Sequence, residues 1–83
     1  MKFELTEHAK KVVAEREIHI EWVAQTVAEP ELRQPDPKDA AVERRYRRIR
    51  EFGGRVLRVA INTRVEPPRV VSVFFDRSMK GKL

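Results

Sequence analysis

The chain has 83 residues, of which 41% are hydrophobic and 37% are charged, and it contains no cysteine. This length suffices for one small domain with a thin core and leaves little room for a large cofactor cavity. The lack of cysteine excludes disulfides, thiolate chemistry, iron–sulfur clusters and cysteine zinc sites. We expect one domain over residues 1–83, with its core at about 3–77, a loose tail at 78–83 and no cofactor.

Basic residues outnumber acidic ones by 18 to 13, which gives a net charge of +5, and they are unevenly distributed. Residues 1–41 carry a net charge of −3, residues 42–58 a net charge of +5, and residues 59–83 a net charge of +3. All seven cations of the middle segment are arginine, the side chain that best binds phosphate and stacks on bases. We therefore expect a polyanion as partner. The N-terminus lacks a signal-peptide core and no stretch resembles a membrane span, so we also expect a cytoplasmic protein.

The first half of the chain predicts a short strand at residues 3–5 and then two helices. Thr6 is a suitable N-cap for the first helix, and apolar residues then recur at helical spacing as far as Arg16. A break follows near residues 17–19. The second helix runs from about residue 20 and is ended by Pro30; its apolar stripe is Ile20, Val23, Ala24 and Val27.

The second half of the chain changes to the alternation typical of strands. Residues 32–39 predict either a short edge strand or a loop. Residues 42–52 and 55–63 predict two strands joined by a Gly53-Gly54 hairpin turn. The apolar run within residues 69–76 suggests a last strand covered on both faces. The predicted fold is α+β, in the order β-α-α-β-β-β, with two helices on one face of a mainly antiparallel sheet.

The predicted middle strand is the most informative segment for function. Alternation puts one set of side chains on one face (Arg44, Tyr46, Arg48, Arg50) and a second set on the other (Arg45, Arg47, Ile49). A tyrosine among arginines offers a stacking surface within a cationic field, which suits single-stranded RNA. The alternative is a solvated, arginine-rich edge strand that resists aggregation.

Two histidines and one tryptophan are further candidates. His8, near the start of the first helix, is suited to general acid–base chemistry, although an ordinary surface histidine fits equally. His19 occupies an N-cap-like position, and the spacing of the two histidines predicts no metal site. Trp22 lies about 200° from Ile20 around the helix, so it either marks a partner interface or packs against residues 35–37.

Several short motifs resemble a small bacterial family, domain of unknown function 4258, over about residues 3–77. They are Thr6-Glu7-His8-Ala9, Arg16-Glu17-Ile18-His19, Val23, Val27, Pro30, Arg55-Val56-Leu57-Arg58-Val59 and Val70-Val71-Ser72-Val73-Phe74. That family is similar to RelE, ParE and BrnT toxins and to ribonuclease domains of secreted bacterial toxins. The resemblance implies a RelE/ParE-like fold and, by position, functional roles for His8, Arg16, Arg48, Arg58, Ser72 and Arg77.

Three positions depart from the pattern of that family. Glu17 stands where the family usually has glycine, and His19 where it has serine or threonine. Ser72 stands where the family has threonine, which preserves the hydroxyl group.

Residues and resemblance together predict a toxin-type, metal-independent endoribonuclease or RNA-binding protein. The expected catalytic residues are His8, Tyr46, Arg48 and Arg58, and the expected RNA-binding residues are Arg16, Arg44, Arg45, Arg47, Arg50, Ser72 and Arg77. An antitoxin would cover the arginine face and contact Trp22. The alternatives are a non-catalytic binding module and a ParE-like toxin that binds a protein. All of these predictions assume one cationic surface within reach of His8.

Overall fold

A computed structural model describes residues 2–83 and confirms the α+β class. Five strands form one sheet in the order β1-β5-β4-β3-β2, in which only the β1–β5 pair is parallel. Of the two readings of residues 32–39, the edge strand is the one observed. The elements are β1 (Glu4–Leu5), α1 (Glu7–Glu15), α2 (Ile20–Ala28), β2 (Leu32–Pro35), β3 (Val42–Ile49), β4 (Arg55–Asn62) and β5 (Arg69–Phe75), with short 3-10 helices η1 (Arg50–Phe52) and η2 (Arg77–Met79).

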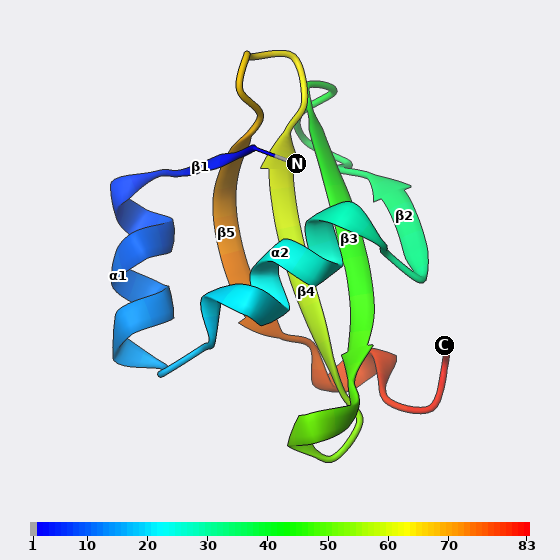
Figure 1. Cartoon of the computed structure of the whole chain (residues 1–83). Coiled ribbons are helices and arrows are strands. Elements are labelled where there is room, and N and C mark those ends of the chain that lie inside the picture. The colour runs from blue at the N-terminus through cyan, green and yellow to red at the C-terminus, as the bar shows by residue number, and fades with distance from the viewer. Residues whose placement is uncertain (1) are drawn as a thin grey trace.

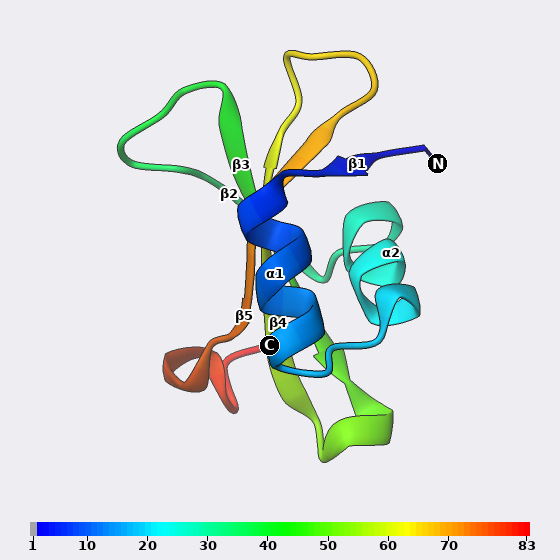
Figure 2. The same cartoon turned by 90° about the vertical axis from the view of Figure 1, so that its left-hand side faces the viewer.

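Helix α2 lies across one face of the sheet, and α1 lies alongside the β5 edge (Figure 1). Helix α1 packs on β5, whereas α2 crosses β4 and β3. Figure 2 views the sheet nearly edge-on and shows α2 on one side and η2 on the other. Within residues 2–83, neither helix is long and apolar enough to cross a membrane.

The core lies between the helices and strand β4. Leu57, Val59 and Ile61 of β4 point toward the helices and are fully buried, and Val56 and Ala60 on the opposite face are also buried. We expected the last strand to be covered on both faces, and this prediction was wrong. Phe74 in β5 is 40% exposed, and β4 is the strand that is covered on both faces.

Helix α1 begins and ends as its sequence suggests. The Thr6 side chain accepts a hydrogen bond from the amide of Ala9 at 3.1 Å, which confirms the predicted N-cap. At the other end, the amide of Ile18 donates to the carbonyl of Val13 and that of Glu17 to the carbonyl of Ala14, a Schellman motif. Glu17 has φ 52°, the left-handed conformation that favours glycine.

Helix α2 buries most of the predicted stripe: Val23 and Val27 are fully buried and Ala24 is half-buried. Ile20 is 48% exposed, whereas Thr26 is fully buried beside Val23 and Val27. Thr26 tolerates burial because its hydroxyl donates to the carbonyl of Trp22 at 2.8 Å. Trp22 lies on this face too. The prediction was wrong at Ile20, and it missed Thr26, whose local hydrogen bond lets a polar residue join the buried face.

Strand β3 ends at Ile49, three residues before the predicted end at 52. The chain then forms η1, followed by Gly53 and Gly54 with φ 69° and 71°. The two glycines make the predicted turn, but the preceding residues leave the sheet. Phe52 instead brings its ring to 5.4 Å from Trp22 and 5.2 Å from Phe75. Packing of one aromatic ring thus shortens the strand.

Candidate functional site

The arginines of β3 lie on two faces, as their alternation predicts, and those facing α2 serve the fold. Arg45 is only 6% exposed, and its Nη1 donates to the carbonyl of Val27 at 2.7 Å. Nη1 of Arg47 donates to the carbonyl of Glu29, also at 2.7 Å. These carbonyls belong to the C-terminal end of α2, where cations are favourable. Arg45 and Arg47 therefore fix α2 to the sheet.

On the opposite face of β3, the arginines are paired with carboxylates. Both oxygens of Glu31 accept hydrogen bonds from the guanidinium of Arg48, the shortest at 2.7 Å. The pKa of Glu31 is lowered, first by these side-chain bonds and then by the bond from the backbone amide of Arg48. Nε of Arg44 lies 3.3 Å from Asp36. Tyr46 sits between them and is 3% exposed, so its ring is not available for stacking.

Arg58 belongs to the same open face and is also engaged. It pairs in register with Tyr46 on one side and with Phe74 on the other. Its guanidinium lies 4.7 Å from the Phe74 ring centroid and 3.6 Å from Asp76. The pKa of Asp76 is lowered, chiefly by a hydrogen bond from Ser78 and to a smaller degree by Arg58. Nε of Arg58 is buried with no hydrogen-bond partner in residues 2–83.

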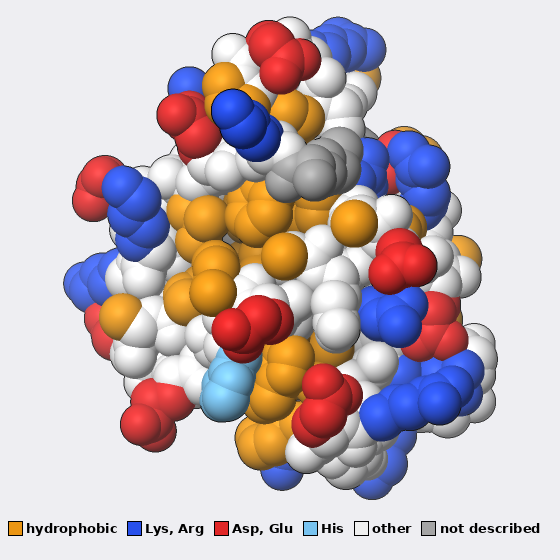
Figure 3. All heavy atoms as spheres, in the orientation of Figure 1, with side chains coloured by type: hydrophobic (Ala, Val, Ile, Leu, Met, Phe, Trp, Pro, Cys, Tyr) orange, Lys and Arg blue, Asp and Glu red, His pale blue; other side chains and the backbone are white. Residues whose placement is uncertain are grey.

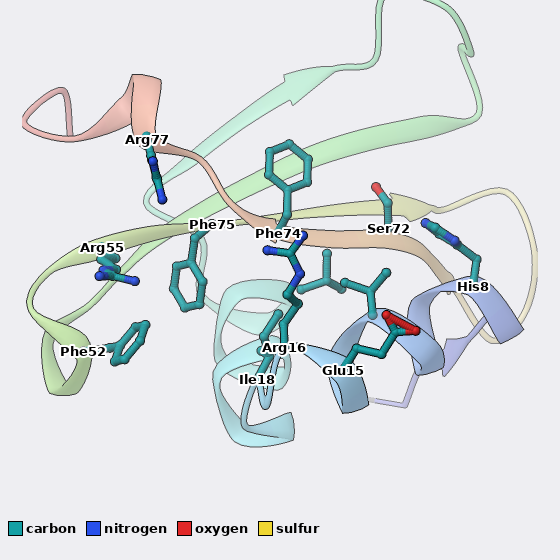
Figure 4. Close-up of a pocket in the computed structure, with 12 residues that line it drawn as sticks. His8, Glu15, Arg16, Ile18, Phe52, Arg55, Ser72, Phe74, Phe75 and Arg77 are labelled. Atoms are coloured by element: carbon teal, nitrogen blue, oxygen red, sulfur yellow. The ribbon is translucent and has the colours of Figure 1, made fainter.

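A groove of about 560 Å³ runs between α1 and β5 (Figure 4). It lies at the β5 edge of the sheet, away from β3. His8 and Ser72 lie together at one end of it, and Arg55 and Arg77 lie at the other. Arg16 extends from the end of α1 toward the middle of the groove. The full lining is His8, Val12, Glu15, Arg16, Ile18, Phe52, Arg55, Ser72, Val73, Phe74, Phe75 and Arg77.

The charge of this groove is less balanced than that of β3. Arg16, Arg55 and Arg77 have no carboxylate within 4 Å anywhere in residues 2–83; Arg55 instead lies 4.6 Å from the Phe52 ring centroid. The one carboxylate of the lining, Glu15, lies 3.8 Å from Lys11. Three arginines therefore face the groove with their charge uncompensated.

The structure brings together only some of the predicted site residues. His8, Arg16, Ser72 and Arg77 line the one groove. The others lie elsewhere: Arg44, Tyr46, Arg48 and Arg58 on the open face, Arg45 and Arg47 under α2, and Arg50 in η1. The expected single cationic surface does not form, because strands β4 and β5 separate β3 from α1.

Sequence reasoning missed Arg55 and the phenylalanines of the groove. Alternation places Arg55 on the same face as Leu57, toward the helices, so the signal for Arg55 was present. Phe52 gave no such signal, because its position depends on the 3-10 helix that ends β3. In the part of the chain from residue 2 onward, no cluster of three His, Asp or Glu side chains is placed to hold a metal ion.

The groove lies almost wholly within a segment that matches a known family. Residues 5–75 match the model of the family described as Domain of unknown function (DUF4258). The chain belongs to this family. The match spans β1 to β5 and includes every residue of the groove lining except Arg77. No curated protein and no solved structure matches the chain. No named relative therefore connects this DUF4258 domain with RelE or ParE toxins.

Proposed function

We propose that this DUF4258 domain binds single-stranded RNA in the groove between α1 and β5 and cleaves it without a metal, as the toxin of a toxin–antitoxin-like pair. One observation supports this more than any other. The groove combines aromatic side chains with arginines that have no carboxylate partner within residues 2–83, and Phe74 is 40% exposed. Guanidinium binds phosphate, and an exposed ring stacks on a base.

Whether an arginine is already paired with a carboxylate decides which surface, the groove or strand β3, is the better binding site for RNA. For Arg48 to bind a phosphate, it would first have to release both oxygens of Glu31. Arg16 and Arg77 have no carboxylate to release within the described residues 2–83, so an incoming anion displaces no ion pair there. Phe74 is held in place by Arg58 stacked on its ring. The proposal therefore gives Arg58 a positioning role beside the groove.

The proposed reaction uses the hydroxyl group that distinguishes RNA from DNA. His8 accepts the proton of the 2′-hydroxyl while the 2′-oxygen attacks the adjacent phosphorus. The bond from phosphorus to the 5′-oxygen breaks, and that oxygen takes a proton from water. The products are a 2′,3′-cyclic phosphate and a 5′-hydroxyl end. Arg16 stabilises the charge that builds up on the phosphorane, and the Ser72 hydroxyl donates to a phosphate oxygen.

A toxin of this type requires an inhibitor, and the groove indicates its chemistry. An acidic segment of an antitoxin would pair its carboxylates with Arg16 and Arg77 and thereby exclude RNA.

Short 5′-labelled single-stranded RNA, incubated with the protein in EDTA, tests the proposal. We expect cleavage by the wild type, and loss of cleavage with retained binding in His8→Ala. Arg16→Gln should weaken RNA binding about tenfold and reduce the salt dependence by about one phosphate contact. Arg48→Gln is the matched control, since it removes an arginine that already has a partner. An effect of Arg48→Gln as large as that of Arg16→Gln would overturn the proposal, as would the absence of RNA binding.

One observation favours a non-catalytic RNA-binding module as the second candidate. The His8 imidazole is exposed, and no group in residues 2–83 hydrogen-bonds to it. A catalytic histidine usually has a partner that fixes its tautomer. Binding that depends on Arg16, without cleavage by the wild type, would establish this second function. Capture of a protein target by a chain with no affinity for RNA would point to a ParE-like activity instead.

A further inference from the structure

A second hollow, of about 440 Å³, adjoins the groove. The two share Arg16, Phe52 and Phe75, so one continuous surface runs from His8 past the end of α1 to the first turn of α2. The hollow is completed by residues of the α1–α2 turn, of α2 and of η1: Glu17, His19, Trp22 and Glu51. Figure 3 shows a histidine on this side of the molecule, beside exposed hydrophobic side chains and between carboxylates.

The wall of the hollow is a stack of flat groups. The rings of His19 and Trp22 lie 4.4 Å apart and within 14° of parallel, and Phe52 continues the stack at 5.4 Å from Trp22. The arrangement is open to solvent, because the His19 side chain is 61% exposed and Phe52 is 40% exposed. His19 makes no side-chain capping bond at the start of α2. One face of its imidazole stacks on Trp22 and Nδ1 lies 3.9 Å from Glu21, and the side chain is otherwise open to a planar ligand.

The charges around the hollow favour a base over a phosphate. Glu17 and Glu51 line it, and neither has a cation within 4 Å in the described part of the chain. Free carboxylates repel phosphate but accept hydrogen bonds from amino groups. The cation of the lining is Arg16, which also lines the groove. A nucleic acid that follows this surface would keep its phosphate at Arg16 and insert a base beyond it.

We infer that the hollow is a second base-binding subsite of the RNA groove, and that it takes a base with an exocyclic amino group: adenine, cytosine or guanine. This inference rests on the proposed function. The base contacts the ring stack of His19, Trp22 and Phe52 while a carboxylate of Glu17 or Glu51 accepts its amino hydrogens. Arg16 binds the phosphate that links this nucleotide to the one in the groove. The substrate is therefore single-stranded and at least two nucleotides long.

Trp22 is the one tryptophan of the chain, so its fluorescence reports directly on the hollow. We would titrate the protein with hexaadenylate and hexauridylate, measuring binding by anisotropy of the labelled RNA and the Trp22 emission in parallel. We expect hexaadenylate to bind more tightly and to change the Trp22 emission. His19→Ala should weaken hexaadenylate binding about tenfold, the usual effect of losing one stacking ring. Ile20→Ala is the control, because Ile20 is 48% exposed and lines neither cavity.

A double variant, Glu17→Gly with Glu51→Ala, tests the carboxylates. It should bring the affinities for the two RNAs to within about twofold of each other, while circular dichroism verifies that the fold is retained. RNA binding that depends on Arg16 but leaves the Trp22 emission and the His19→Ala affinity unchanged would overturn the inference and leave the proposed function intact. No RNA binding in the wild type would overturn both.

Discussion

The arginines of strand β3 and those of the α1–β5 groove have the same chemistry but very different surroundings. On β3, Arg48 has the carboxylate of Glu31 and Arg45 has both the carboxylate of Glu43 and the carbonyl of Val27. In the groove, Arg16 and Arg77 have no carboxylate within 4 Å among residues 2–83. A dense run of arginines thus belongs to the scaffold, while scattered arginines form the cationic surface.

The position of each arginine in the fold explains this difference. Strand β3 lies inside the sheet, beneath the carbonyl end of α2 and next to β2, whose two flanking residues are Glu31 and Asp36. The groove arginines stand at the ends of elements, where few side chains lie within reach: Arg16 at the C-cap of α1, Arg55 at the first residue of β4 and Arg77 in η2. A charged side chain buried within a sheet requires a partner, whereas a charged side chain exposed at the end of a helix or strand does not.

The largest expected effect contrasts Arg45 with Arg16. Arg45→Ala removes a guanidinium that is 6% exposed, leaves the carbonyl of Val27 without this donor and removes one of the two arginines that donate to Oε1 of Glu43. We expect a loss of about 3 kcal/mol in the free energy of unfolding, measured by urea denaturation. Arg16→Ala, at an exposed site, should change it by less than about 0.5 kcal/mol.

If Arg45→Ala does not fold, Arg45→Lys replaces it in the experiment. Lysine keeps the charge but lacks the fork that reaches Glu43 and Val27 together, so an intermediate loss is expected. Equal stabilities for the Arg45 and Arg16 variants would show that the two groups of arginines do not differ in the way we describe.

Much of the fold followed from the sequence because it depends on local patterns. The helix spacing after Thr6 and the alternation around residue 58 each report on the face that a residue takes, and the structure agrees with both. Chain-distant contacts were less accessible. Thr26 is buried through a bond to a backbone carbonyl, and Phe52 leaves the strand because Trp22 offers it a packing surface.

The candidate site was harder to predict, because charge along the sequence says nothing about pairing in space. The run of arginines was visible, but Glu31 and Asp36, which compensate it, lie 17 and 8 residues away along the chain from their partners. His8 was named first for its acid–base chemistry, and Arg16, Ser72 and Arg77 were named from a family resemblance, not from their spacing. That α1 lies against β5, which brings the four together, follows only from the three-dimensional structure.

A smaller effect is expected at Glu17, which follows the groove residue Arg16. Here the backbone conformation, and not a charge, lowers the free energy of unfolding. Glu17 has φ 52° at the position after the C-cap of α1, where glycine is favoured. Glu17→Gly should raise the free energy of unfolding by about 1 kcal/mol, since a side chain in this conformation costs about that much. Glu17→Ala keeps a Cβ atom and should gain little. Equal gains for both variants would attribute the effect to the lost charge instead.

The smallest expected effect is the pH dependence of the β3 ion pairs. The bonds from Arg48 lower the pKa of Glu31 below that of the unfolded chain, so the folded protein binds this proton less readily. The resulting stabilisation is fully present above the unfolded pKa, near 4, and is lost as the pH falls through the lower folded pKa. We expect Glu31→Gln to flatten the fall in Tm between pH 6 and pH 3 by about 2 to 4 °C, as suits a partly exposed pair.

Glu29→Gln is the matched control, because its side chain has no ion-pair partner within residues 2–83 and only its backbone carbonyl contacts Arg47. The fall in its Tm between pH 6 and pH 3 should follow that of the wild type. If Glu31→Gln also leaves this fall in Tm unchanged, Arg48 contributes no pH-dependent stability through Glu31. Arg48 would then be as available to a phosphate as Arg16, and the distinction between the paired strand and the open groove would lose its physical basis.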